Sequence, residues 1–213
     1  YKYSDLGYYF FKKIIEDYYQ LSLDKILESK FYKSIGMQSL GYNPLERINS
    51  SRIIPTELDF VFRSQLLKGY VHDQGAAMQG GVGGHAGIFA NSNDLAKIMQ
   101  MYLQDGEYAN QKYISKKTLK EFTKCQFPQD DNRRGAGFDK PVLDDKLAGP
   151  TCKGISKNSF GHSGFTGTLV WADPSTNIIY VFLSNRIHPD AENKKLIKMN
   201  IRTEIMKVIY DSI

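Results

Sequence analysis

The chain has 213 residues, of which 41% are hydrophobic and 24% charged, a profile typical of one soluble globular domain and not of a disordered segment. Its formal charge of +5 comes from scattered Lys and Arg residues, so we expect no nucleic-acid partner. No apolar run approaches the roughly 18 residues of a membrane-spanning helix, and we expect no membrane span. The first residues include neither an initiator Met nor the segments of a signal peptide, which favours a piece of a longer protein.

Two helices are predicted near the N-terminus. In residues 6–21, apolar side chains recur at spacings of three and four, the stripe of an amphipathic helix. Ser22 is a favourable N-cap for a second helix, which ends before Gly36. Residues 42–79 have no sustained period and predict an irregular stretch with one short helix near 60–67. The stripe of the first helix consists of Leu6, Phe10, Ile14, Tyr18 and Leu21.

A glycine-rich loop, residues 80–87, and two further helices follow. Ser92 is suited to cap a helix that Gly106 ends, and Ser115 opens a shorter helix. Residues 130–157 are polar and rich in turn residues, so they predict loops with a short strand or two. On the shorter helix, the basic pair Lys116-Lys117 predicts a solvated face, and the residues predicted to point inward are Leu119 and Phe122.

The clearest strands lie in the last quarter of the chain. Residues 168–172 and 178–183 are β-branched and aromatic and flank a five-residue turn, which predicts an antiparallel hairpin. Residues 160–165 predict a third strand, and residues 190–210 predict a closing helix. Helices, three antiparallel strands and a last helix give an α+β fold class. The predicted apolar side of the closing helix consists of Ile197, Ile201, Ile205, Val208 and Ile209.

The glycine-rich loop has a formal match to a nucleotide-binding motif. Gly81-x-Gly83-x-x-Ala86 fits the dinucleotide fingerprint, which needs a strand before it and a helix that begins inside it. Polar residues precede this loop and Ile88-Phe89 follows it. We therefore interpret the glycines as positions where the backbone packs closely against other segments.

Histidines and cysteines give no metal or disulfide pattern. No two histidines are four residues apart, so we expect no metal site and no cofactor. Cys125 and Cys152 fit neither a disulfide framework nor a zinc spacing, and we expect them to be unlinked. The four histidines are His72, His85, His162 and His188.

One short motif suggests a nucleophile. Ser22-Leu23-Asp24-Lys25 matches Ser-x-x-Lys, in which the Lys one helical turn later takes the proton of the Ser. Such a Ser needs to begin a buried helix that faces a cleft, whereas Ser22 opens a lysine-rich, half-polar helix. We interpret Ser22 as an N-cap and not as a nucleophile.

Two other motifs carry a resemblance to a known family. Tyr3-Ser4-Asp5 resembles the Tyr-x-Asn element of the serine β-lactamase and penicillin-binding-protein superfamily. Residues 161–168, Gly-His-Ser-Gly-Phe-Thr-Gly-Thr, resemble its Lys-Thr-Gly strand element. The chain is similar to the class C β-lactamase-like branch, which includes esterases and D-amino-acid peptidases. Because the glycine-rich loop and the hairpin also come in the family's order, the resemblance spans nearly the whole chain.

The resemblance implies a fold and an extent. Residues 1–213 would be the C-terminal portion of one α+β domain of the β-lactamase/transpeptidase-like fold, an antiparallel sheet packed with helices. In the family, the Ser-x-x-Lys helix precedes Tyr-x-Asn, so the segment with the nucleophile is absent from this chain. We expect the isolated chain to be inactive. Its expected partner is the missing N-terminal part of the same domain. Without that part, the chain would expose surface that favours self-association.

The resemblance also implies catalytic roles for three residues. Tyr3 would help to deprotonate the Ser and would pass the proton to the leaving group. A phenol with a pKa of about 10 needs positive charge nearby for this task, and His162 would supply part of that charge or a hydrogen bond. Asp5, where the family has Asn, would hold the nucleophilic Lys.

Three further residues would contact the substrate. The backbone N–H of Phe165 would be one oxyanion-hole donor. Gly164 would let the substrate lie against the strand edge, where Ser163 could hydrogen-bond it.

Asp5 and His162 depart from the Asn and Lys of the family. A carboxylate cannot donate a hydrogen bond to a substrate amide, and an imidazole attracts a substrate carboxylate less than an ammonium does. Both departures favour an esterase or peptidase over a β-lactamase.

The resemblance implies a bacterial serine hydrolase that transfers acyl groups from a small-molecule or peptide substrate, an ester or amide related to the cell wall. The location implied is the periplasm or cell envelope. The alternative is a non-catalytic binding or structural module of the same fold. A Ser-x-x-Lys segment upstream of this chain would favour the enzyme.

Overall fold

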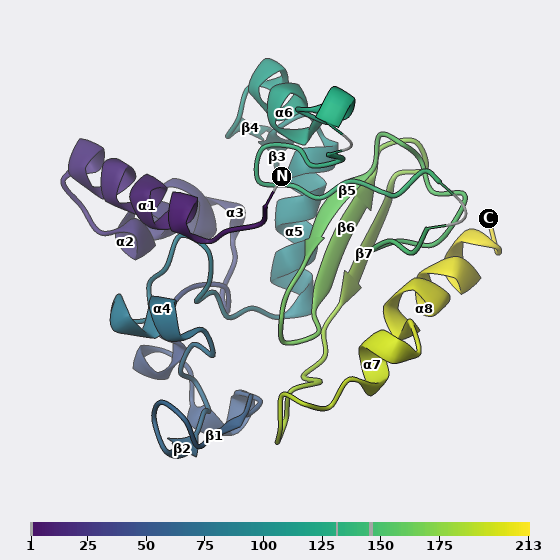
Figure 1. Cartoon of the computed structure of the whole chain (residues 1–213). Coiled ribbons are helices and arrows are strands. Elements are labelled where there is room, and N and C mark those ends of the chain that lie inside the picture. Colours follow the sequence, from purple (N-terminus) through teal and green to yellow (C-terminus); the bar gives the residue numbers. More distant parts are fainter. Residues whose placement is uncertain (1, 131, 145–146) are drawn as a thin grey trace. The chain divides into compact units, whose positions relative to one another are not determined.

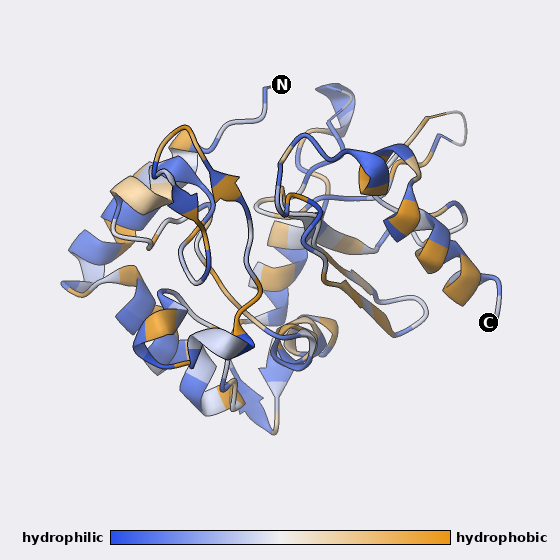
Figure 2. Ribbon diagram, turned by 90° about the horizontal axis from the view of Figure 1, so that it is seen from below, coloured by the Kyte–Doolittle hydropathy of each residue, from blue (hydrophilic) through white to orange (hydrophobic). Residues whose placement is uncertain are grey.

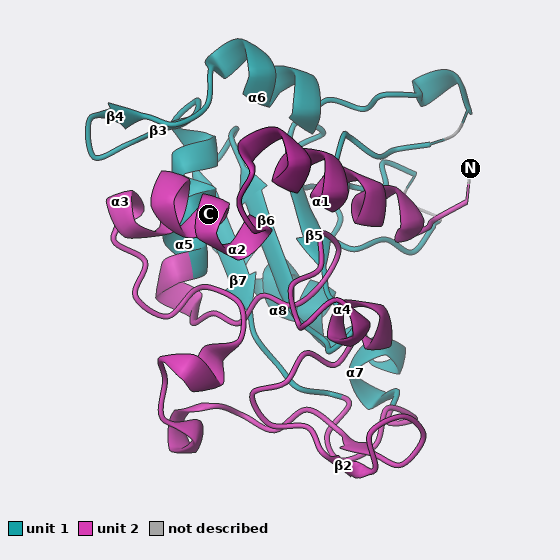
Figure 3. Cartoon of the chain, turned by 90° about the vertical axis from the view of Figure 1, so that its left-hand side faces the viewer, with its two compact units in different colours: residues 1, 95–186, 194–213 teal, residues 2–94, 187–193 magenta. Residues whose placement is uncertain are grey.

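The computed structural model describes residues 2–130, 132–144 and 147–213. They form two compact units (Figure 3). Unit 1 contains Leu95–Arg186 and Lys194–Ile213, and unit 2 contains Lys2–Asp94 and Ile187–Asn193. The assignment of residues 1–213 to one domain stays a prediction. In the described part of the chain, no helix combines the length and the apolar character that crossing a membrane requires.

Unit 2 begins with the two predicted helices. The first, α1, spans Leu6–Tyr19. The second begins as α2, Leu23–Leu27, continues through a π-helical turn, Glu28–Tyr32, and ends as α3, Lys33–Ile35 (Figure 1). Gly36 follows in the left-handed conformation, with φ 73°, so it ends the helix as its position in the sequence predicts.

Helix α1 presents its apolar stripe to solvent. Phe10 is 69% exposed and Tyr18 80% exposed, and the other stripe residues are exposed as well. The half-buried residues of α1 are Tyr9, Lys12 and Glu16. Lys12 and Glu16 form an ion pair at 3.0 Å, and Glu16 Oε1 accepts a hydrogen bond from the backbone N–H that begins α2, at 2.9 Å. The helix is amphipathic as predicted, but its polar face packs against the rest of unit 2.

The predicted helix near 60–67 is wrong, because this segment is a short hairpin. Strand β1, Leu58–Asp59, pairs with β2, Gln65–Leu66. The Asp59 carboxylate accepts hydrogen bonds from three successive backbone N–H groups after it, and Ser64 has φ 51°. These bonds and the left-handed residue fold the chain back on itself instead of extending a helix. The remaining elements of this stretch are 3₁₀ turns at Pro44–Glu46 and Ser50–Arg52 and helix α4, Gln74–Met78.

The glycine-rich loop packs closely, as predicted. Gly81 and Gly87 have φ values of 84° and 120°, which disfavour other residues. A Cβ atom on Gly84 would collide with the backbone carbonyl oxygen of Tyr8 in α1. The glycines therefore bring the loop against α1, and the interpretation as close backbone packing is confirmed.

Helix α5, Ser92–Leu103, runs from the end of unit 2 into unit 1. The capping bond comes from Asn91 Oδ1, which accepts from the Asp94 N–H at 2.8 Å, and not from Ser92 as predicted. The Asp94 carboxylate is buried and accepts from the backbone N–H groups of Ser39 and Leu40, at 2.7 and 3.1 Å. Gly106 has φ 90° and follows the helix as expected.

The three predicted strands form one antiparallel sheet in unit 1, in the order β5–β6–β7 (Figure 1). They span Phe160–Ser163, Leu169–Asp173 and Ile178–Phe182. Strand β5 ends at Ser163, two residues earlier than the predicted end at residue 165. The reason is a turn, in which the Gly164 carbonyl accepts from the Gly167 N–H at 3.0 Å.

Side chains on the two faces of the sheet enter different clusters. Leu169 and Trp171 of β6 pack with Met206 on one face, and Ala172 packs with Met99 of α5 on the other. Burial on both faces fixes the register, since a shift by one residue would exchange the two sets of side chains.

The helices around the sheet differ in detail from the prediction. Helix α6, Lys116–Thr123, is capped by Ser115 Oγ, which accepts from the Thr118 N–H at 3.0 Å. Leu119 is buried as predicted, whereas Phe122 is 49% exposed. A small hairpin of β3, Glu107–Tyr108, and β4, Gln111–Lys112, precedes α6. In the described parts of 130–157, isolated bridges replace the expected short strands.

The predicted single helix 190–210 is two helices, α7, Lys195–Lys198, and α8, Ile201–Tyr210. Asn200 between them has φ 49°, which interrupts the helix. Met206 is the buried residue of α8, while Ile205 and Val208 are exposed. Figure 2 shows hydrophobic and hydrophilic residues alternating along this helix, next to the C-terminus. Two polar contacts attach α8 to the sheet: the Tyr210 hydroxyl donates to Asp173 Oδ2 and Arg202 Nη1 donates to the Thr168 carbonyl, both at 3.0 Å.

Cys125 and Cys152 are free thiols, which confirms that they are unlinked.

Lys140 is a buried cation in unit 1. Its Nζ donates to the Asn158 carbonyl at 3.1 Å and lies 6.0 Å from the centre of the Phe160 ring. Burial lowers the pKa of Lys140 to about 8.

We expect this lysine to make unit 1 more stable at alkaline pH. Between pH 8 and the ordinary Lys pKa of 10.5, the unfolded chain keeps a proton that the folded chain has released, so the free energy of unfolding rises with pH. Lys140→Met removes this rise. Urea unfolding at pH 7 and pH 9.5 measures it, with the exposed Lys153→Met as the control. An equal pH dependence in the wild type and Lys140→Met would contradict the prediction.

Candidate active site

The strand motif lies at an edge of the sheet. His162 and Ser163 are on β5, opposite Val170 and Leu169 of β6. Gly161 uses its outer N–H and C=O to bond Asp139, at 3.1 and 2.7 Å. Because backbone groups point to the same edge at every second residue, those of Ser163 point to that edge as well. The edge next to Ser163 therefore has the orientation needed to bind an extended substrate.

The hydrogen bonds of His162 determine its tautomer. Arg134 Nη1 lies 3.0 Å from His162 Nε2, and the Ser163 carbonyl oxygen lies 2.8 Å from Nδ1. A guanidinium only donates and a carbonyl only accepts. Nε2 therefore accepts from Arg134 and Nδ1 donates to the Ser163 carbonyl, so these contacts select the Nδ1–H tautomer of His162 beside a permanent positive charge.

Arg134 is a residue that the sequence motifs did not identify. Its Nη2 lies 3.5 Å from Asp139 Oδ2, and the neighbouring Arg133 contacts the same carboxylate at 2.8 and 2.9 Å. Asp139 is buried and bonded to β5 through its backbone. Asp139 thus holds Arg133 and Arg134 beside the strand motif. The Arg133-Arg134 pair in a turn-rich segment was the available signal, but its partner is 28 residues away in the sequence.

Gly164 and Phe165 lie in the turn after β5 rather than in the strand. The Gly164 N–H donates to the Thr168 carbonyl at 2.9 Å, and a Cβ on Gly164 would collide with the Thr168 hydroxyl. Phe165 is exposed, and its ring centre lies 4.8 Å from the guanidinium carbon of Arg186. The turn itself therefore explains why residue 164 is a glycine. The role of Gly164 in binding substrate stays a prediction.

The other motif, Tyr3-Ser4-Asp5, belongs to unit 2. Tyr3 is 55% exposed. Asp5 occupies the N-cap position of α1, but its side chain makes no capping bond to the helix. Its carboxylate instead lies near the carboxylate of Asp73 and the imidazole of His85. One potential ligand atom from each of the three residues lies within 4.8 Å of the other two.

Two groups near Asp5 have shifted pKa values. Loss of hydration raises the pKa of Tyr9, and the charges of Asp73 and Asp5 add to this effect. For Asp73, burial opposes ionisation, but hydrogen bonds from the Ala76 N–H and from His85 outweigh it and lower its pKa.

The two motifs belong to different units, residues 3–5 to unit 2 and residues 161–168 to unit 1. That His162 assists Tyr3 stays a prediction, and so do the roles of Asp5, Ser163, Gly164 and Phe165.

Ser22 occupies the N-cap position of α2 as predicted, but its side chain makes no capping hydrogen bond. It is exposed, and Lys25 is paired with Asp24 and Glu28 at 3.9 and 3.8 Å. An exposed hydroxyl and a paired lysine do not form an activated nucleophile, which agrees with its interpretation as a fortuitous match.

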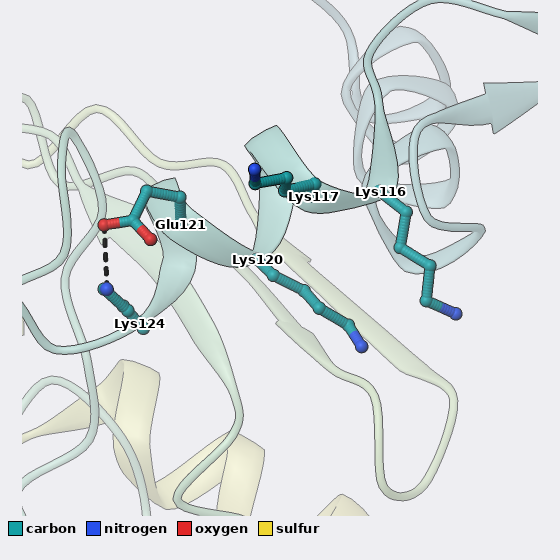
Figure 4. A pocket seen from close by; sticks show the side chains of 5 residues that line it. All are labelled: Lys116, Lys117, Lys120, Glu121 and Lys124. Atoms are coloured by element: carbon teal, nitrogen blue, oxygen red, sulfur yellow. Dashed lines mark ion pairs between the residues drawn. The ribbon is translucent and has the colours of Figure 1, made fainter.

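A hollow on the surface of unit 1 is lined by one face of α6 (Figure 4). Lys117 and Lys120 are exposed, Lys116 pairs with Asp105 at 2.5 Å, and Lys124 pairs with Glu121 at 2.8 Å. The acidic residue that lines it, Glu121, has its carboxylate paired with Lys124. The hollow confirms the prediction of a solvated basic face and has no feature of a reaction site.

The tautomer of His162 is testable in solution. We expect the Nδ1–H form, because the Arg134 guanidinium can only donate to Nε2. Long-range ¹H–¹⁵N correlation spectra of the imidazole at neutral pH distinguish the two tautomers. Arg134→Gln should change the ¹⁵N shift of Nε2, whereas Arg133→Gln should leave it in place. A predominant Nε2–H form in the wild type would contradict the assignment.

The family model described as Beta-lactamase matches residues 1–200. Proteins named "Putative D-alanyl-D-alanine carboxypeptidase" from Salmonella gallinarum and Salmonella typhi are 35% identical over 207 residues. The alignment covers 91% of this chain and 47% of each relative, so the chain spans about half the length of these curated relatives.

Solved structures show the same fold at lower identity. A β-lactamase from Mycobacterium bovis has a TM-score of 0.63 at 16% identity, covering 98% of this chain and 64% of that one. A variant of simvastatin synthase from Aspergillus terreus has a TM-score of 0.65 at 17% identity, covering 96% of this chain and 53% of that one. By the family match and these relatives, the chain belongs to the β-lactamase family of serine hydrolases and corresponds to part of its α+β fold.

Proposed function

We propose that this chain is the substrate-binding portion of a bacterial envelope peptidase that removes a D-amino acid with a free carboxylate from cell-wall peptides by acyl transfer. The observation that carries the proposal is the pairing of Arg134 with His162 at the edge strand. The relatives named putative D-alanyl-D-alanine carboxypeptidases support it.

Arg134 supplies the charge that such a substrate requires. A guanidinium stays positive at all relevant pH values and has five N–H donors in one plane, so the bond to His162 leaves capacity for a carboxylate. Its Nη2 contact with Asp139 holds the group beside β5. In this proposal, Arg134 binds the substrate carboxylate, a role that the family motif gives to Lys.

The remaining roles follow the resemblance. The substrate extends along the outer edge of β5, where the backbone N–H of Ser163 donates to it, and Gly164 leaves room beside the strand. The Phe165 N–H donates to the developing oxyanion. Tyr3 moves the proton between the nucleophile and the leaving amine, and Asp5 holds the Lys of the Ser-x-x-Lys segment.

The exposed apolar face of α1 is evidence that a further segment packs on it. Its apolar stripe is solvated while its polar face is packed, and the chain spans about half the length of its curated relatives. We propose that a segment equivalent to the other half of those relatives covers this face and supplies the Ser-x-x-Lys nucleophile.

Activity tests the substrate class. In a longer protein with a Ser-x-x-Lys segment upstream of this chain, we expect release of D-alanine from a peptide that ends in D-Ala-D-Ala, with a higher kcat/KM than for a cephalosporin. Arg134→Gln should lower kcat/KM for that peptide by about 10- to 100-fold, since a hydrogen bond to a charged group contributes roughly 1.5–3 kcal/mol. Hydrolysis of a neutral activated ester should change little.

Arg133→Gln is the matched control, because Arg133 contacts Asp139 and the Lys140 carbonyl but not His162. Equal losses on peptide and neutral ester in Arg134→Gln would exclude carboxylate recognition. A wild-type preference for the cephalosporin would exclude the proposed substrate class.

The α1 face has its own test. Phe10→Ser with Ile14→Ser should destabilise the longer protein by at least about 3 kcal/mol, because burying each side chain contributes about 1.5–3 kcal/mol. In the isolated chain, the same change should alter stability by no more than about 0.5 kcal/mol and should reduce self-association. Urea unfolding and sedimentation velocity measure these effects, with Lys13→Ser on the same helix as the control. A small effect in the longer protein would show that this face stays solvated.

A further inference from the structure

Three potential metal ligands from separate segments meet in unit 2. Asp5 precedes α1, Asp73 is the N-cap of α4, and His85 lies in the glycine-rich loop. One donor atom from each lies within 4.8 Å of the others, and all three residues are half-buried. The fold, and not a local motif, creates this cluster.

His85 is held with its Nε2 directed at the carboxylates. Nε2 lies 2.7 Å from Asp73 Oδ1, and only 4% of the side chain is exposed. The Tyr9 ring packs on the imidazole, with 4.6 Å between the ring centres. Its other nitrogen, Nδ1, is buried and has no hydrogen-bond partner in the described part of the chain. Packing therefore fixes the ring without help from a bond at Nδ1.

The two carboxylates are placed by different means. Asp73 Oδ1 also accepts from the Ala76 N–H at 2.7 Å, so α4 fixes its position. Asp5 stands at the start of α1, yet its side chain makes no capping bond and contributes its charge to the cluster instead. Two negative charges so close together repel each other unless a cation lies between them.

We propose that Asp5, Asp73 and His85 bind one divalent transition-metal ion, with Zn²⁺ as the preferred occupant. One imidazole nitrogen and two carboxylate oxygens suit zinc, which takes three protein ligands and a water in an open tetrahedral site. Mg²⁺ and Ca²⁺ favour oxygen ligands alone, and an imidazole disfavours them. The ion's charge of +2 offsets the two carboxylates.

The distances require only a small adjustment. Donors about 2 Å from a tetrahedral zinc ion are roughly 3–3.5 Å apart, whereas the cluster spans up to 4.8 Å. Each side chain has to move by less than about 1 Å for the ion to replace the hydrogen bond between His85 and Asp73. The site does not depend on the proposed peptidase function, although Asp5 belongs to both.

Zinc titration of the 213-residue chain tests the proposal without any activity assay. Competition with a chromogenic zinc indicator should show one site, and Co²⁺ substitution should give the visible absorption bands of tetrahedral coordination. Asp5→Asn and His85→Gln should each weaken zinc binding by at least about tenfold. Mg²⁺ and Ca²⁺ should not compete at equal concentration.

His72→Gln is the matched control. His72 forms a similar pair with Glu57, at 2.6 Å, but belongs to no three-ligand group among the described residues. The His72→Gln variant should bind zinc with the affinity of the wild type. Asp5→Asn keeps the bond between His85 and Asp73, so it tests the site even where His85→Gln impairs folding. Absence of saturable zinc binding, or unchanged affinity in Asp5→Asn, would overturn the proposal.

Discussion

The pairing of β5 with β6 is the constraint on which the candidate site depends. His162 lies opposite Val170, and its neighbours on β6, Leu169 and Trp171, are almost completely buried. A shift of one residue would move those side chains to the other face, at a large cost in buried apolar area. The core therefore holds the strand motif in one register, and the turn at Gly164 determines where the strand ends.

Periodicity predicted the elements whose packing is regular, and it failed where a single side chain or backbone conformation overrode it. Strands β6 and β7 follow from β-branched and aromatic runs. The helix expected near 60–67 does not form because Asp59 captures the backbone N–H groups that follow it. The helix of 190–210 breaks at Asn200, whose left-handed conformation has no clear signal in the pattern.

An amphipathic pattern also does not tell which face meets the rest of the chain. In α1 the apolar stripe is solvated, and the ion pair of Lys12 with Glu16 lies on the packed side. Polar contacts explain why this face packs against the rest of unit 2. Glu16 accepts a hydrogen bond from the first residue of α2, and the carboxylate of Asp5 lies beside that of Asp73. Hydrophobic periodicity identified the helix, whereas its orientation depends on polar contacts between segments distant in sequence.

The same limit applies to the chemistry of the site. The sequence motif identified His162, but its tautomer depends on Arg134, 28 residues away, and Arg134 is positioned by Asp139. In the family element that residues 161–168 resemble, one Lys provides both the positive charge and the hydrogen bond. Here the permanent charge belongs to the Arg134 guanidinium, and the strand position belongs to the His162 imidazole. Because Nε2 of His162 is occupied as an acceptor, a substrate carboxylate would have to meet the guanidinium, whose planar donors favour that group. Although residue 162 is not Lys, a permanent positive charge therefore still lies at the strand edge, on Arg134 of another segment.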